Sequence, residues 1–163
     1  MMRIAPLAAD DIGRVVALAR HVWQATYAAL ISQAQIDYML GQRYAPEALA
    51  SQLDDPAHVW RVAWVDGQCT GFAHGIVAAG HARLDKLYVA PAWQRRGIGA
   101  ALLAAVEGVA RAEGAQRIRL QVNRGNAQAI AAYRKYGFSV VEARVFDIGA
   151  GFVMDDYVME KTL

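Results

Sequence analysis

The chain has 163 residues, of which 56% are hydrophobic and 20% are charged, and its formal net charge is +2 at pH 7. This composition excludes intrinsic disorder and supplies enough apolar side chains for a full core without metal or disulfide support. The weak positive charge argues against a nucleic-acid-binding protein, which usually carries a clustered basic face. We therefore expect one domain over residues 1–163 with no nucleic-acid partner.

Cysteine content and hydropathy indicate the compartment. The single Cys69 cannot form an intrachain disulfide, which is usual in a reducing cytoplasm. The sequence shows no secretory leader and no apolar run of the ~18 residues that a membrane helix needs. We therefore expect a soluble cytoplasmic protein without a membrane partner. Cys69 is expected to be a small buried strand residue, with a catalytic thiol as the alternative.

The first third of the chain is predicted to be mostly helical. A short strand at Arg3–Pro6 ends at its proline, and Asp10 or Asp11 can cap a helix whose apolar residues recur at helical spacing. Two shorter helices are predicted to follow Ser32 and Pro46.

Three strands joined by short turns are predicted next, at Val59–Val65, Thr70–Val77 and Leu84–Val89. The first two flank Asp66-Gly67, which is typical of a two-residue hairpin turn. Because consecutive strands with short connections pair in opposite directions, we expect an antiparallel meander.

The second half is predicted to alternate helices and strands, which gives a mixed α/β domain. In this half, Glu107 and Arg111 are expected to form an exposed ion pair on the first helix. The strand after that helix should run parallel to the strand before it. The predicted elements are a helix at Gly99–Glu113, a strand at Ile118–Val122, a helix from Asn126 to Gly137, and strands at Phe138–Phe146 and Tyr157–Thr162.

A basic, glycine-spaced loop at Gln94–Gly99 stands between a predicted strand and a long helix. A glycine loop at a helix start directs free backbone N–H groups and the positive end of the helix dipole at one point, which suits a phosphate. No lysine and hydroxyl follow the loop as in a Walker motif, and Leu102 stands where a dinucleotide fingerprint needs its third glycine. The loop therefore predicts another kind of phosphate site, with a helix-capping turn as the alternative.

Three stretches of the chain resemble the GNAT superfamily of N-acetyltransferases. The loop Gln94-Arg95-Arg96-Gly97-Ile98-Gly99 is similar to its acetyl-CoA loop, and Leu87-Tyr88-Val89-Ala90-Pro91 is similar to its splayed central strand. The stretch Asn123-x-x-Asn126-x-x-Ala129-x-x-x-Tyr133-x-x-x-Gly137-Phe138 resembles its second motif. The resemblance implies an acyl-CoA N-acyltransferase fold, with a mostly antiparallel mixed sheet, flanking helices and a splayed central strand. It also implies acetyl-CoA-dependent transfer of an acetyl group to a primary amine.

The resemblance assigns the cofactor end of the site. Backbone N–H groups from Arg95 to Ala100 would hold the pyrophosphate, the N–H of Leu87 would hold the acetyl carbonyl, and Val89 would pair with the pantetheine arm. Asn126 would bond the same arm, although helix capping explains it equally well. The full set implied for the cofactor is Leu87, Tyr88, Val89, Gln94, Arg95, Arg96, Gly97, Ile98, Gly99, Ala100, Asn126 and Tyr133.

The resemblance places Tyr133 at the tyrosine that protonates the departing thiolate, with Tyr136 as the competing candidate. The base is open, because Arg83 stands where many relatives carry a glutamate. Asp85 is the nearest carboxylate, and a structural ion pair is its alternative role. His74 and His81 are two further candidates for the base, because an imidazole ordinarily titrates near neutrality. No spacing of His, Cys and acidic residues suggests a metal site.

The acceptor is expected to be a small amine. Trp23 and Tyr27 resemble the helical wall of the acceptor site in small-molecule GNAT enzymes, with ordinary core residues at helical spacing as the alternative. The last strands resemble bacterial polyamine (spermidine/spermine) N-acetyltransferases. Those enzymes carry an acidic residue at the position of Asp85, which favours a cationic acceptor. The alternatives are acetylation of a protein N-terminus or lysine and a non-catalytic acyl-CoA-binding module. Analogy with the family allows a homodimer. The acids available to bind a cation are Asp37, Asp85, Asp155 and Asp156.

Overall fold

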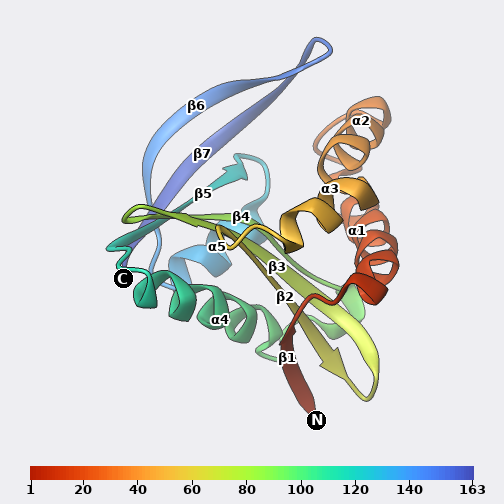
Figure 1. The fold of residues 1–163 in the computed structure, drawn as a ribbon. Coiled ribbons are helices and arrows are strands. Elements are labelled where there is room, and N and C mark those ends of the chain that lie inside the picture. Colours follow the sequence, from red (N-terminus) through yellow and green to blue (C-terminus); the bar gives the residue numbers. More distant parts are fainter.

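The computed structural model describes residues 1–163 and has the predicted order of elements (Figure 1). Two single turns of 3-10 helix, at Ala9–Asp11 and Pro91–Trp93, precede α1 and α4. The helices are α1 (Ile12–Tyr27), α2 (Gln33–Arg43), α3 (Pro46–Leu53), α4 (Ile98–Ala112) and α5 (Ala127–Lys135). The strands are β1 (Met2–Pro6), β2 (His58–Val65), β3 (Gln68–Ala78), β4 (His81–Val89), β5 (Arg117–Asn123), β6 (Ser139–Gly149) and β7 (Phe152–Thr162).

The strands form one mixed sheet in the order β1-β2-β3-β4-β5-β7-β6. All neighbours are antiparallel except β4 and β5, so both the predicted meander and the predicted parallel pair are confirmed. The parallel pair is short, because only Ala82 with Ile118 and Arg83 with Arg119 are in register. Beyond Arg83 the two strands separate, and this splay opens the middle of the sheet.

Helices cover both faces of the sheet and bury two apolar cores. The core on one face contains residues of α4, such as Leu102 and Val106, against the middle strands. On the opposite face, helices α1 to α3 pack on β2 and β3 around Trp23 and Phe72. The close approach of α4 requires Gly75 in β3, since a Cβ at that position would lie 2.5 Å from the Cγ1 atom of Val106.

The β6–β7 hairpin is longer than predicted and extends beyond the rest of the sheet (Figure 1). The predicted strands ended at Phe146 and began again at Tyr157, whereas the observed strands continue to Gly149 and from Phe152. The turn is compact because the residues at 149–151 all have positive φ, which allows the strands to pair up to it. The far end of this hairpin contacts α2, where the hydroxyl of Tyr38 donates a hydrogen bond to the carbonyl of Ile148 at 2.9 Å.

The expected ion pair between Glu107 and Arg111 is wrong. Glu107 is buried on α4, and its carboxylate lies 2.8 Å from the ammonium group of Lys161 on β7. A buried carboxylate needs a charged partner, and only the folded sheet brings Lys161 to it.

Candidate active site

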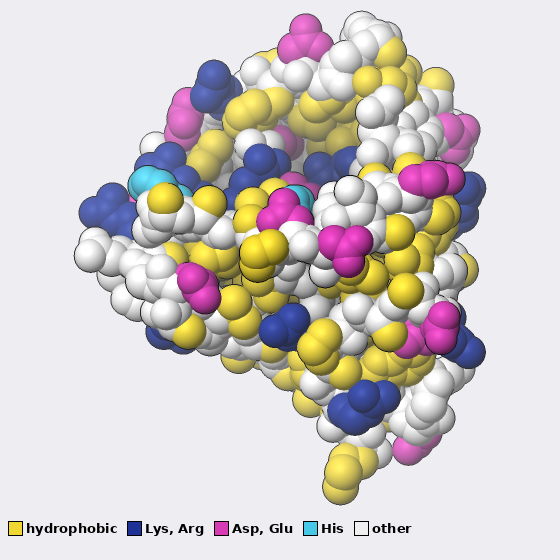
Figure 2. All heavy atoms as spheres, viewed as in Figure 1, with side chains coloured by type: hydrophobic (Ala, Val, Ile, Leu, Met, Phe, Trp, Pro, Cys, Tyr) yellow, Lys and Arg dark blue, Asp and Glu magenta, His cyan; other side chains and the backbone are white.

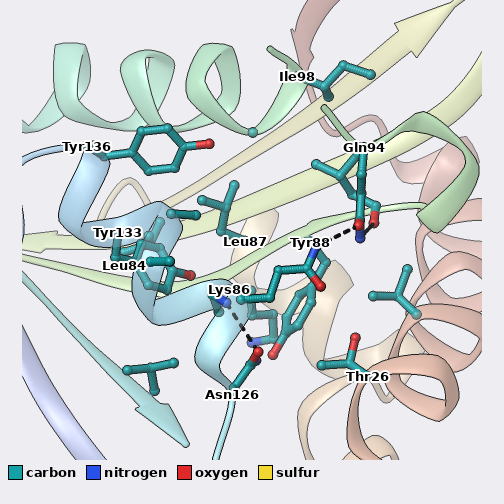
Figure 3. A pocket seen from close by; sticks show the side chains of 18 of the residues that line it. Thr26, Leu84, Lys86, Leu87, Tyr88, Gln94, Ile98, Asn126, Tyr133 and Tyr136 are labelled. Atoms are coloured by element: carbon teal, nitrogen blue, oxygen red, sulfur yellow. Dashed lines mark hydrogen bonds between the residues drawn. The ribbon is translucent and has the colours of Figure 1, made fainter. Parts of the chain in front are cut away.

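A cleft of about 560 Å³ opens where β4 and β5 separate (Figure 3). Strand β4 lines it with Leu87, Tyr88 and Val89, α5 lines it with Tyr133, and Tyr136 lines it directly after the end of α5. The loop before α4 closes the remaining side with Gln94, Arg95, Gly97, Ile98 and Gly99. The structure thus brings most of the predicted cofactor residues together around one cavity.

The edge of β4 in this cleft carries backbone groups without strand partners. The N–H of Ala90 donates to the carbonyl of Thr70 on β3 at 2.8 Å. Because successive N–H groups of a strand point to opposite sides, those of Val89 and Leu87 point away from β3, toward the gap left by β5. The carbonyl of Val89 accepts a hydrogen bond from the side chain of Gln94 at 3.2 Å. This edge is suited to an extended ligand that carries amide groups.

The loop before α4 gathers N–H groups at the other end of the cleft. Arg95 and Gly97 both adopt the left-handed conformation, with φ of 64° and 78°. No side chain caps α4, so the first N–H groups of the helix are free to hold an anion. Two predicted cofactor residues do not line the cleft: Arg96 stacks over the ring of Trp93 at 4.7 Å, and Ala100 lies one residue into the helix beyond Gly99.

Helix α5 and the residue that caps its C-terminus supply the two tyrosine candidates, Tyr133 and Tyr136. The helix begins at Asn126, whose side-chain oxygen accepts a hydrogen bond from the N–H of Ala129 at 3.2 Å, and Asn126 also lines the cleft. Burial raises the pKa of the Tyr133 phenol, so this group keeps its proton at neutral pH. Tyr136 lies nearer the α4 N-terminus, with its hydroxyl 3.2 Å from where a Cβ of Gly99 would stand. Figure 3 shows both phenol rings on the α5 side of the cavity.

A second, narrow cavity of about 70 Å³ adjoins the cleft. Five residues line both cavities, namely Tyr27, Leu84, Asp85, Tyr88 and Gln121. Aromatic side chains form part of the shared wall, where the hydroxyls of Tyr27 and Tyr88 are 2.9 Å apart and hydrogen-bonded. The further lining residues of the small cavity are Trp23, Met39, Arg43, Arg83, Asn123, Ile148, Met154 and Asp156.

Both residues predicted for the acceptor wall lie at this second cavity. Trp23 is buried, packs against Tyr27 with 4.4 Å between ring centres, and donates a hydrogen bond to the hydroxyl of Tyr44 at 3.1 Å. Trp23 therefore combines the two roles open to it, as a core residue and as part of a cavity wall.

Asp85, the predicted base, lies among cationic groups. It is an extra residue in β4, because Lys86 pairs with His74 of β3 whereas Leu84 pairs with the next residue, Gly75. Its carboxylate lies 2.5 Å from the ammonium group of Lys86 and 3.2 Å from the Nδ1 atom of His74. Two guanidinium groups complete the surroundings, at 3.1 Å for Arg83 and 3.5 Å for Arg43.

These neighbours make Asp85 a weak base. Burial acts to raise its pKa, but the hydrogen bond from His74 and the charges of Arg43 and Lys86 outweigh burial, so the pKa of Asp85 lies well below its usual value. Burial lowers the pKa of the neighbouring Lys86 to about 8, against the opposing effect of Asp85. The geometry therefore favours the ion-pair role for Asp85 over proton acceptance.

The other candidates for base or nucleophile lie outside both cavities. His74 stacks on Trp60 with 4.4 Å between ring centres, and burial lowers its pKa to about 4. His81 is exposed at the start of β4. Burial raises the pKa of the Cys69 thiol to about 11, which leaves little thiolate at neutral pH.

Asp156 is the acidic residue of the small cavity that sequence reasoning left without a specific role. It is 4% exposed on β7, opposite Asn123 of β5, and its Oδ1 atom is buried without a hydrogen-bond partner. Burial and the nearby Asp155 raise the pKa of Asp156 to about 6, while Arg43 acts in the opposite direction. The sequence signal was only an Asp-Asp pair in a predicted loop. Because β7 begins at Phe152, both aspartates lie within the strand, where alternation directs their side chains to opposite faces.

The approach to the small cavity lies under the β6–β7 hairpin. Figure 2 shows this end of the molecule hollowed between the hairpin and α2, with basic and acidic side chains at the bottom of the hollow. Gln35 of α2 donates a hydrogen bond to the carbonyl of Val153 at 2.7 Å, so helix and hairpin are joined. The small cavity is thus enclosed by α2 and the β6–β7 hairpin as well as by the sheet.

Comparison with known proteins identifies the class. The chain belongs to the acetyltransferase (GNAT) family, whose model matches residues 14–138. The protein is therefore an N-acetyltransferase that uses acetyl-CoA, and the predicted family, fold and cofactor are confirmed. The uncapped start of α4 and the open edge of β4 fit the pyrophosphate and the amide-bearing arm of this cofactor.

Two relatives match the chain over nearly its whole length. A spermidine N(1)-acetyltransferase of Thermoplasma acidophilum is 27% identical over 94% of this chain and 96% of its own. An uncharacterized N-acetyltransferase of Mycobacterium tuberculosis is 30% identical over 94% of this chain and 98% of its own. The crystal structure of the PaiA N-acetyltransferase from Thermoplasma acidophilum in complex with coenzyme A is 27% identical, with a TM-score of 0.87 over 100% of this chain and 99% of that one. No helix of the present structure has the length and apolar character needed to cross a bilayer.

Proposed function

We propose that this enzyme acetylates a primary amine on a small, linear, cationic molecule. The observation that carries the proposal is the narrow cavity beside the cofactor cleft, which has aromatic walls and the unpaired carboxylate of Asp156. Cations are stabilised by carboxylates and by aromatic faces. A walled cavity of this size suits an aminoalkyl chain better than a folded protein surface.

Acetyl-CoA supplies an acetyl group as a thioester, which reacts readily with an amine. We propose that the N–H groups of Leu87 and Val89 bind the acetyl carbonyl and the pantetheine arm, because they face the gap in the sheet. The loop from Arg95 to Gly99, with the uncapped start of α4, would hold the pyrophosphate. Asn126 is assigned mainly to capping α5, with its free amide hydrogens available to the arm.

Tyr133 is proposed as the group that serves the leaving sulfur. Its phenol is protonated throughout the neutral range and donates a hydrogen bond that stabilises a developing thiolate. Because burial raises its pKa, it passes a proton to sulfur only as it takes one from the amine nitrogen. Asp85 is proposed as a positioning residue, since its carboxylate holds Arg43 at the small cavity and Lys86 at the cleft.

The Thermoplasma relative named for spermidine acetylation supports a polyamine-like acceptor. It matches 94% of this chain and 96% of its own length, so the proposed acceptor region has a counterpart in it. The β6–β7 hairpin and α1 both contribute to the cavities, which supports one catalytic domain over residues 1–163.

A panel of amines tests the proposal. The purified protein is assayed with acetyl-CoA and with propylamine, spermidine, free amino acids and an alanine-terminated peptide. We expect the highest kcat/KM for the linear amines and spermidine. A preference for the peptide would instead support a protein acetyltransferase. Binding of acetyl-CoA without turnover of any amine would support a non-catalytic module.

A further inference from the structure

We propose that Asp156 is the residue that binds the ammonium group of the acceptor and then accepts its proton. This inference rests on the proposed function and names the group at that site which recognises the amine. It transfers the role expected of Asp85 to a strand on the other side of the splayed sheet.

The sheet topology places Asp156 across the gap from β4. Asp156 pairs in register with Asn123 at the end of β5, well beyond the two residue pairs that join β5 to β4. Gln121 and Asn123 alternate with buried Val122 along β5, and both line the small cavity together with Asp156. Asp156 therefore faces the cavity from one side, and β4 closes it from the other.

The two carboxylates of this cavity differ in their partners. Asp85 has four cationic or imidazole neighbours within 3.5 Å, so its oxygen atoms are already occupied. Asp156 forms no ion pair or side-chain hydrogen bond. Its side chain is nevertheless only 4% exposed, and its Oδ1 atom is buried. A buried carboxylate without a donor is unfavourable, and a bound ammonium group would supply the missing donors.

Burial and Asp155 raise the pKa of Asp156, and Arg43 lowers it. The phenols of Tyr27 and Tyr88 are neutral at neutral pH because burial raises the pKa of each. Arg43 is the cation that acts on Asp156, and its guanidinium is directed at Asp85, donating to the backbone carbonyl of that residue at 2.8 Å. The charged and titratable groups around the cavity and beside Asp156 are Tyr27 on α1, Arg43 on α2, Arg83, Asp85 and Tyr88 on β4, Arg144 on β6, which is in register with Asp156, and Asp155 on β7.

Acetyl transfer begins with the loss of one proton from the bound ammonium group. One N–H bond of that group breaks as an O–H bond forms on Asp156, which leaves a lone pair on nitrogen. That lone pair forms the amide C–N bond while the thioester C–S bond breaks and its electron pair passes to sulfur. The sulfur takes a proton through Tyr133, which recovers one from the second N–H of the nitrogen, and Asp156 returns its proton to solvent.

A pair of neighbouring variants tests the assignment. Asp156→Asn keeps the shape of the side chain and removes its charge, whereas Asp155→Asn changes an exposed residue that pairs with Arg124. We expect kcat/KM for spermidine to fall by about 10²–10⁴-fold in Asp156→Asn, with loss of the acid limb of the pH profile and unchanged binding of acetyl-CoA. Asp155→Asn should keep the acid limb and move it to lower pH with little loss of plateau kcat/KM, because Asp155 contributes to the raised pKa of Asp156. Equal kcat/KM and an unchanged acid limb in Asp156→Asn would overturn the proposal.

A second readout does not depend on turnover. The aspartate carboxyl carbons are labelled with ¹³C and titrated by NMR on the complex with coenzyme A, with and without spermidine, and Asp156→Asn assigns the resonance. We expect the Asp156 resonance to titrate near pH 6 and to move to lower pH when spermidine binds. A titration that saturating spermidine leaves unchanged would overturn the inference.

The two readouts separate the inference from the proposed function. A response of Asp156 to spermidine without acetyl transfer supports the binding site and contradicts the proposed function. Acetyl transfer that Asp156→Asn leaves intact supports the proposed function and contradicts this inference.

Discussion

Asp85 and Lys86 are consecutive residues of β4, yet their side chains form a buried ion pair with 2.5 Å between Oδ2 and Nζ. Lys86 is 4% exposed, and its ammonium group also lies 5.4 Å from the ring centres of Tyr44 and Trp60. The extra residue in β4 makes this contact possible, because regular strand alternation would direct the two side chains to opposite faces.

Asp85→Asn should therefore destabilise the fold. Removing one partner leaves a buried cation uncompensated, which costs about 3–5 kcal/mol. Urea unfolding at neutral pH measures the loss, and Asp85→Asn combined with Lys86→Met should recover much of it. A single variant as stable as the wild type would show that the ion pair has no structural role.

Tyr133→Phe should reduce kcat by about 10²-fold, because the hydrogen-bond donor to the leaving sulfur is lost. The KM for acetyl-CoA should change little, since the ring remains. Tyr136→Phe, at the C-cap of the same helix, is the matched control and should retain most of the activity. The reverse result would assign the donor role to Tyr136.

Gly97→Glu should weaken acetyl-CoA binding by more than about tenfold, or about 1.4 kcal/mol, because a carboxylate would face the pyrophosphate. Gly80→Glu is the control, since both glycines have positive φ, of 78° and 83°, and neither has a neighbour within 4 Å of an added Cβ. Isothermal calorimetry compares the two variants. Equal affinities would place the phosphate elsewhere.

Asp156→Asn should make the protein more stable above pH 6. The folded state raises the pKa of Asp156 from 3.8 to about 6, so it binds more protons than the unfolded state in this window and loses stability as pH rises through it. The loss reaches about 3 kcal/mol at neutral pH, and the amide variant avoids it. Below pH 3.8 the carboxyl is protonated in both states and the gain should vanish. Urea titrations on both sides of this window check the sign, with Glu142→Gln, a change of an exposed acid on β6, as control.

Gln35→Ala should raise the KM for the amine several-fold and leave the KM for acetyl-CoA unchanged. The variant removes the hydrogen bond from α2 to Val153, worth about 0.5–1.5 kcal/mol, and so loosens the wall over the small cavity. Gln33→Ala removes an exposed glutamine of the same helix that bonds Gln24 instead, and should have no such effect. Similar KM values for both variants would contradict this role of the wall.

The cofactor end of the site could be predicted from sequence because its determinants are local. The strand, the glycine loop and the helix that begins at Ile98 follow one another along the chain, and each has its own periodicity or turn signal. The left-handed φ of Gly97 agrees with the turn that this sequence predicts. The family motifs then specified the kind of phosphate.

The acceptor end could not be predicted in the same way, because its contacts join distant segments. The neighbours of Asp85 include Arg43 from α2 and His74 from β3, and no local pattern signals that three elements meet there. Asp156 reaches the cavity only because β7 is inserted between β5 and β6. Glu107 was misread for a related reason, since its partner Lys161 lies at the end of the chain.

The backbone N–H groups of Leu87 and Val89 face the gap between β4 and β5, and an extended cofactor arm would act there as an inserted partial strand. A ligand that binds only the folded state adds about 2.7 kcal/mol of stability at a concentration one hundred times its Kd. The lifetime of this protein against proteolysis is therefore expected to rise and fall with the supply of acetyl-CoA, so that its abundance as well as its rate follows the cell's acetyl supply.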